Sequence, residues 1–425
     1  MPAPSAPAAP PRGVRRLDPA LVVMLAGVCA ALHVGKLPPA LHTLQQAFGL
    51  TLVQAGFLLS LVQLAGMTAG VAFGVLADGI GLRRSMLAGL VLLALASAAG
   101  GAADGVPMLM LLRACEGCGF LLAALPAPAL VRRLVPAERI SLVLGLWGAY
   151  MPLATALVLL LGPLAIAAFG WRAWWYGLGA LTGAMALWLA RAVPADRPRP
   201  HPLAPAGMAA RAAPAWTARL ARTLVAPGPW LVALTFAAYS AQWLAIIGFL
   251  PVIYTEAGFG AAATGALTAA VAAVNMIGNI GAGQLLHRGW PAPRLLAIGF
   301  VTMALAGAAT FAATASGPLL PHSARYAAVL LLSAVGGLIP ATLFALAVRL
   351  APGEAMISST VGWMQQWSSF GQFVGPPLVA AVASAAGGWQ RTWLVTGACC
   401  LGGLALSAAL AARLRQPTPA RSGHG

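Results

Sequence analysis

Residues 85–104 read SMLAGLVLLALASAAGGAAD, an apolar run that follows Arg83 and Arg84 and ends at Asp104. A helix that crosses the hydrocarbon core of a bilayer needs about 20 such residues. The whole 425-residue chain has the same character, because 60% of its residues are hydrophobic and only 8% are charged. A water-soluble domain carries about 25% charged residues. The sequence therefore predicts an all-α polytopic membrane protein and excludes a soluble or largely disordered chain.

Short polar segments divide the chain into twelve apolar stretches. A long segment rich in Pro, Arg and Ala, residues 194–227, predicts a cytoplasmic linker between two six-helix halves, 19–193 and 228–412. Residues 1–18 are expected to form a disordered cytoplasmic N-terminus, and residues 413–425 a cytoplasmic tail. The expected spans are 19–41, 53–77, 85–104, 106–131, 138–169, 172–193, 228–256, 261–286, 293–316, 324–349, 355–385 and 390–412.

The two halves share short sequences in the same order. Gly170-Trp171-Arg172 opens the sixth expected span, and Gly388-Trp389-Gln390-Arg391 opens the twelfth. Gly162-Pro163 lies late in the fifth span, as Gly375-Pro376-Pro377 lies in the eleventh. This order indicates a duplicated six-helix unit. Secondary transporters built in this way bind solute near the midplane, between the halves.

The net charge of +17 indicates how the chain is oriented in the membrane. With a cytoplasmic N-terminus, 20 of the 25 basic residues fall in cytoplasmic segments, as the positive-inside rule requires. We therefore expect no nucleic-acid partner, both termini in the cytoplasm, and a multi-pass location in a bacterial-type inner membrane. The first apolar run, after Arg15 and Arg16, also resembles a signal peptide, but eleven further runs favour a retained span.

Residues 74–84, between the second and third expected spans, read GVLADGIGLRR. This stretch resembles the G-x-L-a-D-r-x-G-r-r signature of the major facilitator superfamily, with Gly79 and Leu82 where the family usually has basic residues. Residues 113–119, RACEGCG, likewise resemble the family's R-x-x-q/e-G-x-g motif of the fourth span. The resemblance implies two six-helix halves around a central cavity. The first half is most similar to the cyanate-permease-like branch.

The resemblance also implies a cytoplasmic gate. Asp78, with Gly74, Gly81, Arg83 and Arg84, would latch this gate and release it during each transport cycle. Glycines allow the tight turns and close helix approach that such a loop needs, and Asp78 can accept hydrogen bonds from a neighbouring helix N-terminus. The alternative is a solvated acid beside two arginines that only set orientation.

Four ionisable residues stand out inside the expected spans of the first half: His33 and Lys36 in the first span, Arg113 and Glu116 in the fourth. Such residues usually pair with one another or face a cavity. Lys36, the chain's one lysine, and Arg113 both lie roughly 9 Å to the outer side of the midplane, so they can meet. We expect Lys36, Arg113 and His33 to bind an anionic or zwitterionic substrate. The alternatives are a Lys36 that snorkels to the interface, a static Arg113–Glu116 pair and a packing histidine.

Glu116 is the candidate for proton coupling. Its protonation depends on its neighbours, so a substrate that arrives at Arg113 can free Glu116 to take up a proton. His33 is the second candidate, because an imidazole ordinarily changes charge near neutral pH.

Polar and aromatic side chains replace charges in the second half. Tyr239, Gln242 and Trp243 of the seventh span, and Gln365 and Gln366 of the eleventh, are candidate substrate-binding residues. Polar side chains also hold helices together, so we expect only part of the set to touch substrate. The same spans also carry Trp363, Trp367, Ser368, Ser369 and Gln372.

These features predict a monomeric secondary active transporter that moves a small organic, anionic or zwitterionic solute, coupled to protons, by alternating access. A proton-driven exporter of a metabolite, siderophore or drug is the alternative, although Val158 replaces the first glycine of the exporter motif before Gly162-Pro163. A non-transporting membrane sensor is a third possibility. The sequence has no phosphate-binding loop, metal-ligand cluster or nucleophile–base arrangement, so we expect no enzymatic activity, cofactor or metal.

Overall fold

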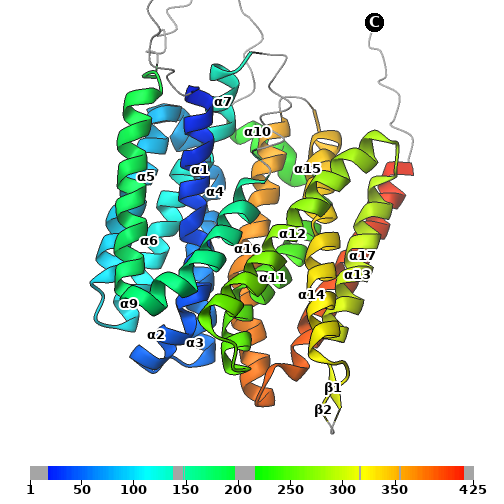
Figure 1. Cartoon of the computed structure of the whole chain (residues 1–425). Helices are drawn as coiled ribbons and strands as arrows, with labels where there is room; N and C mark the ends of the chain where they lie inside the picture. The colour runs from blue at the N-terminus through cyan, green and yellow to red at the C-terminus, as the bar shows by residue number, and fades with distance from the viewer. Residues whose placement is uncertain are drawn as a thin grey trace, which may run out of the picture.

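The computed structural model describes residues 18–136, 147, 149–196, 216–314, 317–353 and 356–415, and only the backbone of residues 71, 74–79 and 216 (Figure 1). In this part, eleven helices are long and apolar enough to cross a bilayer. The longest, α9 (Tyr150–Ala192), has 43 residues and is about 65 Å long, twice the thickness of a hydrocarbon core. Gly170 interrupts it with φ 80° and ψ 163°. The two parts of α9 are the fifth and sixth spans, which confirms the all-α fold with twelve spans.

In the first half, identifiable residues mark where helices begin and end. The Asp18 side chain accepts a hydrogen bond from the backbone of Ala20 and caps the first helix. That helix ends before Pro38 and Pro39, which lack the N–H that a continuing helix needs. The elements are α1 (Pro19–Gly35), a 3₁₀ turn (Pro38–Ala40), α2 (Leu41–Phe48), α3 (Leu52–Ser60), a second turn (Leu61–Gln63), α4 (Leu64–Ile80), α5 (Leu82–Gly101), α6 (Val106–Ala124), α7 (Ala127–Leu134) and α9.

The second half repeats this pattern after a linker helix that the sequence did not predict, α10 (Trp216–Val225). Pro376 and Pro377 lie inside the long helix α16, which continues through them, as α9 continues through Pro163. The elements are α11 (Pro227–Glu256), α12 (Ala261–His287), α13 (Ala292–Phe311), the antiparallel strands β1 (Ala313–Thr314) and β2 (Gly317–Pro318), α14 (His322–Gly336), α15 (Leu338–Leu350), α16 (Ile357–Ala386), a 3₁₀ turn (Trp389–Arg391) and α17 (Thr392–Arg415).

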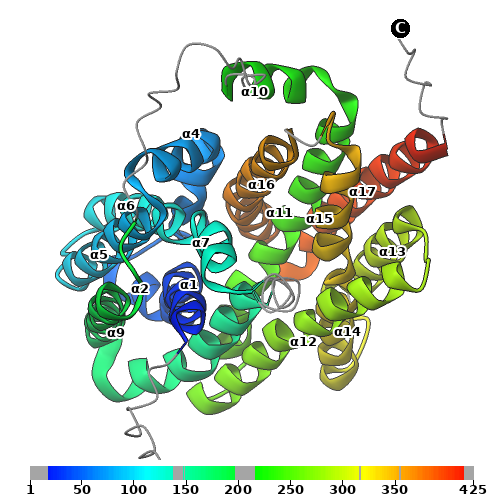
Figure 2. The ribbon, with the colours of Figure 1, turned by 90° about the horizontal axis from the view of Figure 1, so that it is seen from above.

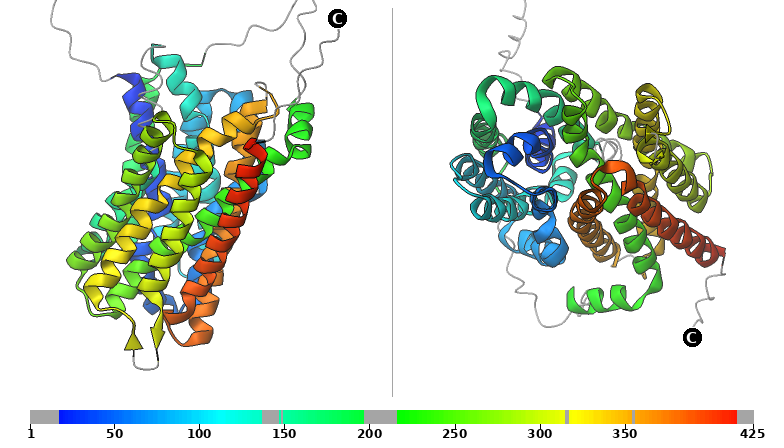
Figure 3. Two further views of the ribbon diagram at one scale, coloured as in Figure 1. Left: turned by 90° about the vertical axis from the view of Figure 1, so that its right-hand side faces the viewer. Right: turned by 90° about the horizontal axis from the view of Figure 1, so that it is seen from below.

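The two groups of helices stand side by side when the molecule is seen from above (Figure 2). The linker helix α10, the start of α1 and the end of α17 lie at one end of the molecule, and the β1–β2 hairpin lies at the other (Figures 1 and 3). Helices α3 and α4 pack against α16, and α9 packs against α12. Near the end opposite α10, one hydrophobic cluster contains residues of both groups, among them Leu41, Trp175, Phe249 and Val379.

Small residues allow the groups to approach closely, as is usual between membrane helices. A Cβ added at Gly56 would lie 2.8 Å from the Cα of Pro377, and one at Gly265 would lie 3.0 Å from the carbonyl oxygen of Leu160. Any side chain at Gly56 would therefore push the two groups apart at this contact.

Candidate functional site

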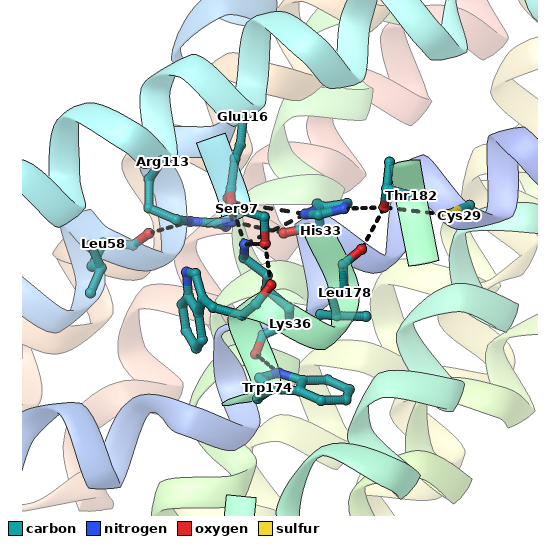
Figure 4. A network of polar contacts seen from close by, with 11 residues as sticks. Cys29, His33, Lys36, Leu58, Ser97, Arg113, Glu116, Trp174, Leu178 and Thr182 are labelled. Atoms are coloured by element: carbon teal, nitrogen blue, oxygen red, sulfur yellow. Dashed lines mark hydrogen bonds and ion pairs between the residues drawn. The ribbon is translucent and has the colours of Figure 1, made fainter. Parts of the chain in front are cut away.

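Four ionisable side chains meet in the interior of the first half (Figure 4). His33, Lys36, Arg113 and Glu116 are 0%, 0%, 1% and 1% exposed. Lys36 pairs with one carboxylate oxygen of Glu116, and Arg113 Nη1 donates to the other at 2.5 Å. The expectation that Lys36 and Arg113 can meet is therefore confirmed. They meet through Glu116, which leaves two cations on one anion.

The Lys36 ammonium group points into the bundle. It donates a hydrogen bond to Ser97 Oγ of α5 at 2.9 Å, and it lies 4.8 Å from the centre of the Trp175 ring of α9. An ammonium group over an aromatic face is stabilised by the ring's quadrupole. Lys36 does not snorkel to the membrane interface, because its ammonium group is enclosed by helices.

Arg113 connects the fourth span to the end of the first. Its Nη1 donates to the backbone oxygen of His33 at 2.7 Å, and its Nε donates to the backbone oxygen of Leu58 at 3.4 Å. The carbonyl of His33 is free to accept because α1 ends two residues later, and the last carbonyls of a helix have no partner within it. The remaining nitrogen, Nη2, is buried and has no hydrogen-bond partner among the described residues.

The imidazole of His33 bridges this cluster to α9. Its Nε2 lies 2.7 Å from Thr182 Oγ1, and the Thr182 hydroxyl donates to the backbone oxygen of Leu178 at 2.8 Å. With its one proton used there, Thr182 accepts from His33, so Nε2 carries the ring proton. His33 Nδ1 is then an acceptor, and it lies 3.5 Å from Lys36 Nζ.

The sequence did not point to Ser97, Trp175 or Thr182. Ser97 is the only hydroxyl between Ser85 and Asp104 in an otherwise apolar span, which was a weak signal. Trp175 and Thr182 lie in the sixth span, and the sequence does not say which side of that span faces α1.

Two candidates from the second half bond within their own group of helices. The Tyr239 hydroxyl of α11 accepts a hydrogen bond from Asn275 Nδ2 of α12 at 3.1 Å. Gln242 accepts one from Cys400 Sγ of α17 at 3.2 Å and also lines an apolar hollow of about 190 Å³ between α11, α16 and α17. Both side chains are thus used in helix packing.

The other three candidates are only half-buried. Trp243 lies on α11, and Gln365 and Gln366 lie on α16. The indole Nε1 of Trp243 is buried without a hydrogen-bond partner in the described part of the chain, as is that of Trp363. No hydrogen bond among the described residues joins these side chains to the charged cluster of the first half.

A row of polar side chains crosses between the halves. Gln63 Nε2 donates to Gln372 Oε1 of α16 at 3.0 Å, and Ser369 Oγ donates to Gln63 Oε1 at 3.3 Å. Gln372 continues the row to Ser368 at 3.2 Å, which lies 2.7 Å from Ser240 of α11. The sequence identified the residues on α16 as polar but did not single out Gln63, their partner.

The predicted gate residues lie at the α10 end of the first half. Gly74 and Asp78 belong to the last turns of α4, and the side chain of Asp78 lies outside the described residues, so its latch role stays a prediction. Gly81 joins α4 to α5 with φ 106°, a conformation that favours glycine.

The carboxylate at the start of α5 comes from Asp196, beyond the end of α9. Its oxygens accept hydrogen bonds from the backbone N–H of Arg83 at 3.1 Å and of Arg84 at 3.0 Å. Arg133 Nη1 lies 3.9 Å from the same carboxylate. A carboxylate is stabilised at a helix N-terminus by the free N–H groups and the helix dipole. Because Gly81 has no capping side chain, a residue distant in sequence caps α5.

Within the described ranges, no group of three His, Cys, Asp or Glu side chains has an arrangement that could hold a metal ion. None of the five cysteines forms a disulfide bond. Cys115 and Cys118, three residues apart on α6, are both free thiols.

Comparison with known proteins connects this architecture to transport. The chain is 30% identical over 240 residues to a 2-nitroimidazole transporter of Escherichia coli (strain K12), a match that covers 54% of this chain and 55% of the relative. The chain thus spans about half the length of that relative.

Solved structures share the fold at low sequence identity. A bacterial homologue of the human lysosomal transporter Spinster, crystallised inward-facing and unoccupied, superposes with a TM-score of 0.79 at 15% identity, over 96% of this chain and 100% of that one. A D-xylose–proton symporter superposes with a TM-score of 0.71 at 16% identity, over 92% and 95%. The family model of the Major Facilitator Superfamily matches residues 23–376. The chain therefore belongs to the major facilitator superfamily.

Proposed function

We propose that this transporter moves a small anionic or zwitterionic organic solute by alternating access and couples that movement to protons. The observation that carries the proposal is the buried Arg113 Nη2, which has no described partner and lies in a cluster with more positive than negative charge. Buried polar groups are rarely left without a hydrogen bond. An anionic group of the solute would complete this site.

The charge of the cluster favours an anion. Lys36 and Arg113 contribute two positive charges and Glu116 one negative charge, while His33 accepts from Lys36 through a neutral ring. A positive charge without a counterion is costly in a low-dielectric interior. A carboxylate or similar group bound at Arg113 would balance it.

The same contacts support proton coupling at Glu116. An anion that binds Nη2 of Arg113 shares the guanidinium group with Glu116 and brings a second negative charge close to this carboxylate. A carboxylate beside another negative charge takes up a proton more readily. Solute and proton would therefore bind together, with His33, 3.9 Å from Glu116 Oε1, as the second proton site.

The second half would complete the solute site as the halves move together. The indole N–H of Trp243, which has no hydrogen-bond partner among the described residues, and the side chains of Gln365 and Gln366 offer hydrogen-bond donors. The Trp243 ring also offers a flat apolar surface. Tyr239 and Gln242 would serve as a supporting layer, because their polar atoms already bond within the bundle.

A second candidate solute is a nitro-substituted heterocycle. The Escherichia coli relative is a 2-nitroimidazole transporter, and 2-nitroimidazole is a small planar compound with two polar nitro oxygens. The indole ring of Trp243 suits a planar ring, and the Arg113 guanidinium suits the nitro oxygens. Such a solute also fits the exporter alternative.

The proposed location is a bacterial-type inner membrane, with a single chain as the working unit and the α10 end in the cytoplasm. Basic residues support this orientation, because the last turns of α7, α9, α15 and α17 at that end all contain arginine. Cytoplasmic ends of membrane proteins are enriched in such residues.

The experiment that tests the proposal is transport in proteoliposomes with a panel of small organic anions and 2-nitroimidazole. A proton gradient of each sign is imposed, and the wild type is compared with Arg113→Lys. We expect an anion to accumulate with an inward proton gradient, and Arg113→Lys to lose most of this uptake because lysine lacks the second donor group. Accumulation driven only by the opposite gradient would assign the protein to export. Equal transport by both proteins would overturn the anion site.

A further inference from the structure

A hollow of about 530 Å³ opens at the α10 end of the second half, between α13, α15 and α17. Each of the three helices contributes one arginine to its lining: Arg294, Arg349 and Arg415. Most of the other lining residues are apolar, among them Ala297, Leu404 and Ala408. The hollow thus joins a basic rim to an apolar floor.

The three arginines have no described counterion. All three are exposed, and none of their guanidinium groups forms an ion pair or hydrogen bond with another described residue. The second half has two acids, Glu256 and Glu354. Glu256 is bonded to Trp389, at the far end of α11. Glu354 lies outside the described residues, and no acid occurs in residues 416–425.

The corresponding place in the first half is filled by the chain itself. The start of α5, the end of α7 and the end of α9 correspond to the start of α13 and the ends of α15 and α17, as third, fourth and sixth spans of their halves. There, Asp196 accepts from the backbone of Arg83 and Arg84 and lies near Arg133. The first half thus supplies its own anion, and the second half presents arginines around an open hollow.

The position of the hollow identifies the anion that suits it. Arg294 lies in the first turn of α13, and Arg349 and Arg415 lie in the last turns of α15 and α17, where a spanning helix meets the lipid headgroups. Apolar side chains continue from this point along the lipid-facing side of α13 and α17: Val301 is 44% exposed, Leu305 69% and Leu401 68%.

We propose that this hollow binds one anionic glycerophospholipid. The three guanidinium groups hold the phosphate, because arginine forks match phosphate oxygens. The glycerol region rests on Ala297 and Ala408, and the acyl chains follow the exposed apolar side chains of α13 and α17. Basic pockets between membrane helices at the cytoplasmic side are known to bind such headgroups. The bound lipid ties the ends of three helices together, as Asp196 does in the first half.

The test uses the full-length protein in detergent and measures bound phosphatidylglycerol by native mass spectrometry, with phosphatidylcholine as the uncharged comparison. The test variant is Arg294→Gln/Arg349→Gln/Arg415→Gln. The control, Arg132→Gln/Arg219→Gln/Arg222→Gln, removes the same charge at the same end but outside the hollow. We expect phosphatidylglycerol to bind the test variant roughly 100-fold more weakly than the wild type and the control almost unchanged. Equal losses in both variants would overturn the proposal.

Further arms separate the lipid from other anions and from a folding defect. If the triple variant does not fold, Arg349→Gln alone is tested instead, and we expect it to weaken binding about fivefold. Ala408→Phe fills the apolar floor and should weaken lipid binding while all three arginines are kept. If glycerol phosphate without acyl chains raises the unfolding temperature as much as the lipid does, the site binds a free anion and the proposal fails.

Discussion

Lys36 of α1 and Glu116 of α6 form an ion pair in the interior of the first half, where their side chains are 0% and 1% exposed. Arg113 occupies the second oxygen of the same carboxylate. Glu116 is thus the one anion paired with two cations. We therefore expect the loss of Glu116 to lower the free energy of unfolding more than the loss of either cation.

The first prediction concerns this inequality. Glu116→Gln leaves both Lys36 and Arg113 buried without an anion, and it should lower the free energy of unfolding by about 3 kcal/mol or more. Lys36→Met keeps the Arg113–Glu116 pair and should cost less. Unfolding of the purified protein in detergent measures both. A Lys36→Met variant as unstable as Glu116→Gln would contradict the arrangement.

The second prediction concerns coupling. Glu116→Gln cannot exchange a proton, so its residual transport should no longer respond to an imposed proton gradient, whereas Glu116→Asp should keep part of the response. Glu256→Gln, which changes an acid at the far end of α11, is the control and should respond like the wild type. Proteoliposome uptake at a series of pH gradients measures this. Full gradient dependence in Glu116→Gln would exclude Glu116 as the coupling site.

The third prediction concerns Ser97, which accepts from Lys36 and donates to the backbone oxygen of Trp175 at 2.8 Å. Ser97→Ala removes a hydrogen bond to a charged group and should cost about 2 kcal/mol of unfolding free energy. Ser407 is also buried but donates only to Gly403 in its own helix, so Ser407→Ala should cost clearly less. Equal unfolding temperatures for the two variants would show that Ser97 does not support Lys36.

The fourth prediction concerns the cap of α5. Asp196→Ala leaves two backbone N–H groups at the start of this helix without their acceptor and should cost about 1–2 kcal/mol. Asp104→Ala removes a carboxylate that is 92% exposed in its ion pair with Arg172, and an exposed pair contributes little. Thermal unfolding of both variants gives the comparison. Similar losses would mean that Asp196 stabilises no more than a surface charge does.

Much of the fold could be predicted from the sequence. Apolar stretches of about 20 residues, such as 85–104, identify spans. The backbone N–H and C=O groups of a segment in lipid must bond to one another, and a helix allows this. The first span was predicted over 19–41, but α1 ends at Gly35, before Pro38 and Pro39, because proline has no N–H to continue a helix. The linker helix α10 was missed because a search for apolar stretches of about 20 residues passes over a short basic helix. Its apolar residues Trp216, Leu220 and Leu224 do recur at the spacing of an amphipathic helix.

The candidate site was predictable only in part. The sequence alone determined that Arg113 and Glu116 share a helix face and that Lys36 lies at their depth, because the rise and turn of a helix are constant. The tertiary structure decided that Lys36 takes one oxygen of Glu116 and Arg113 the other, that Ser97, Trp175 and Thr182 surround them, and that Asp196 caps α5. These contacts join residues up to 149 positions apart. They depend on which helices are neighbours and how each is rotated, and packing among all the helices sets both.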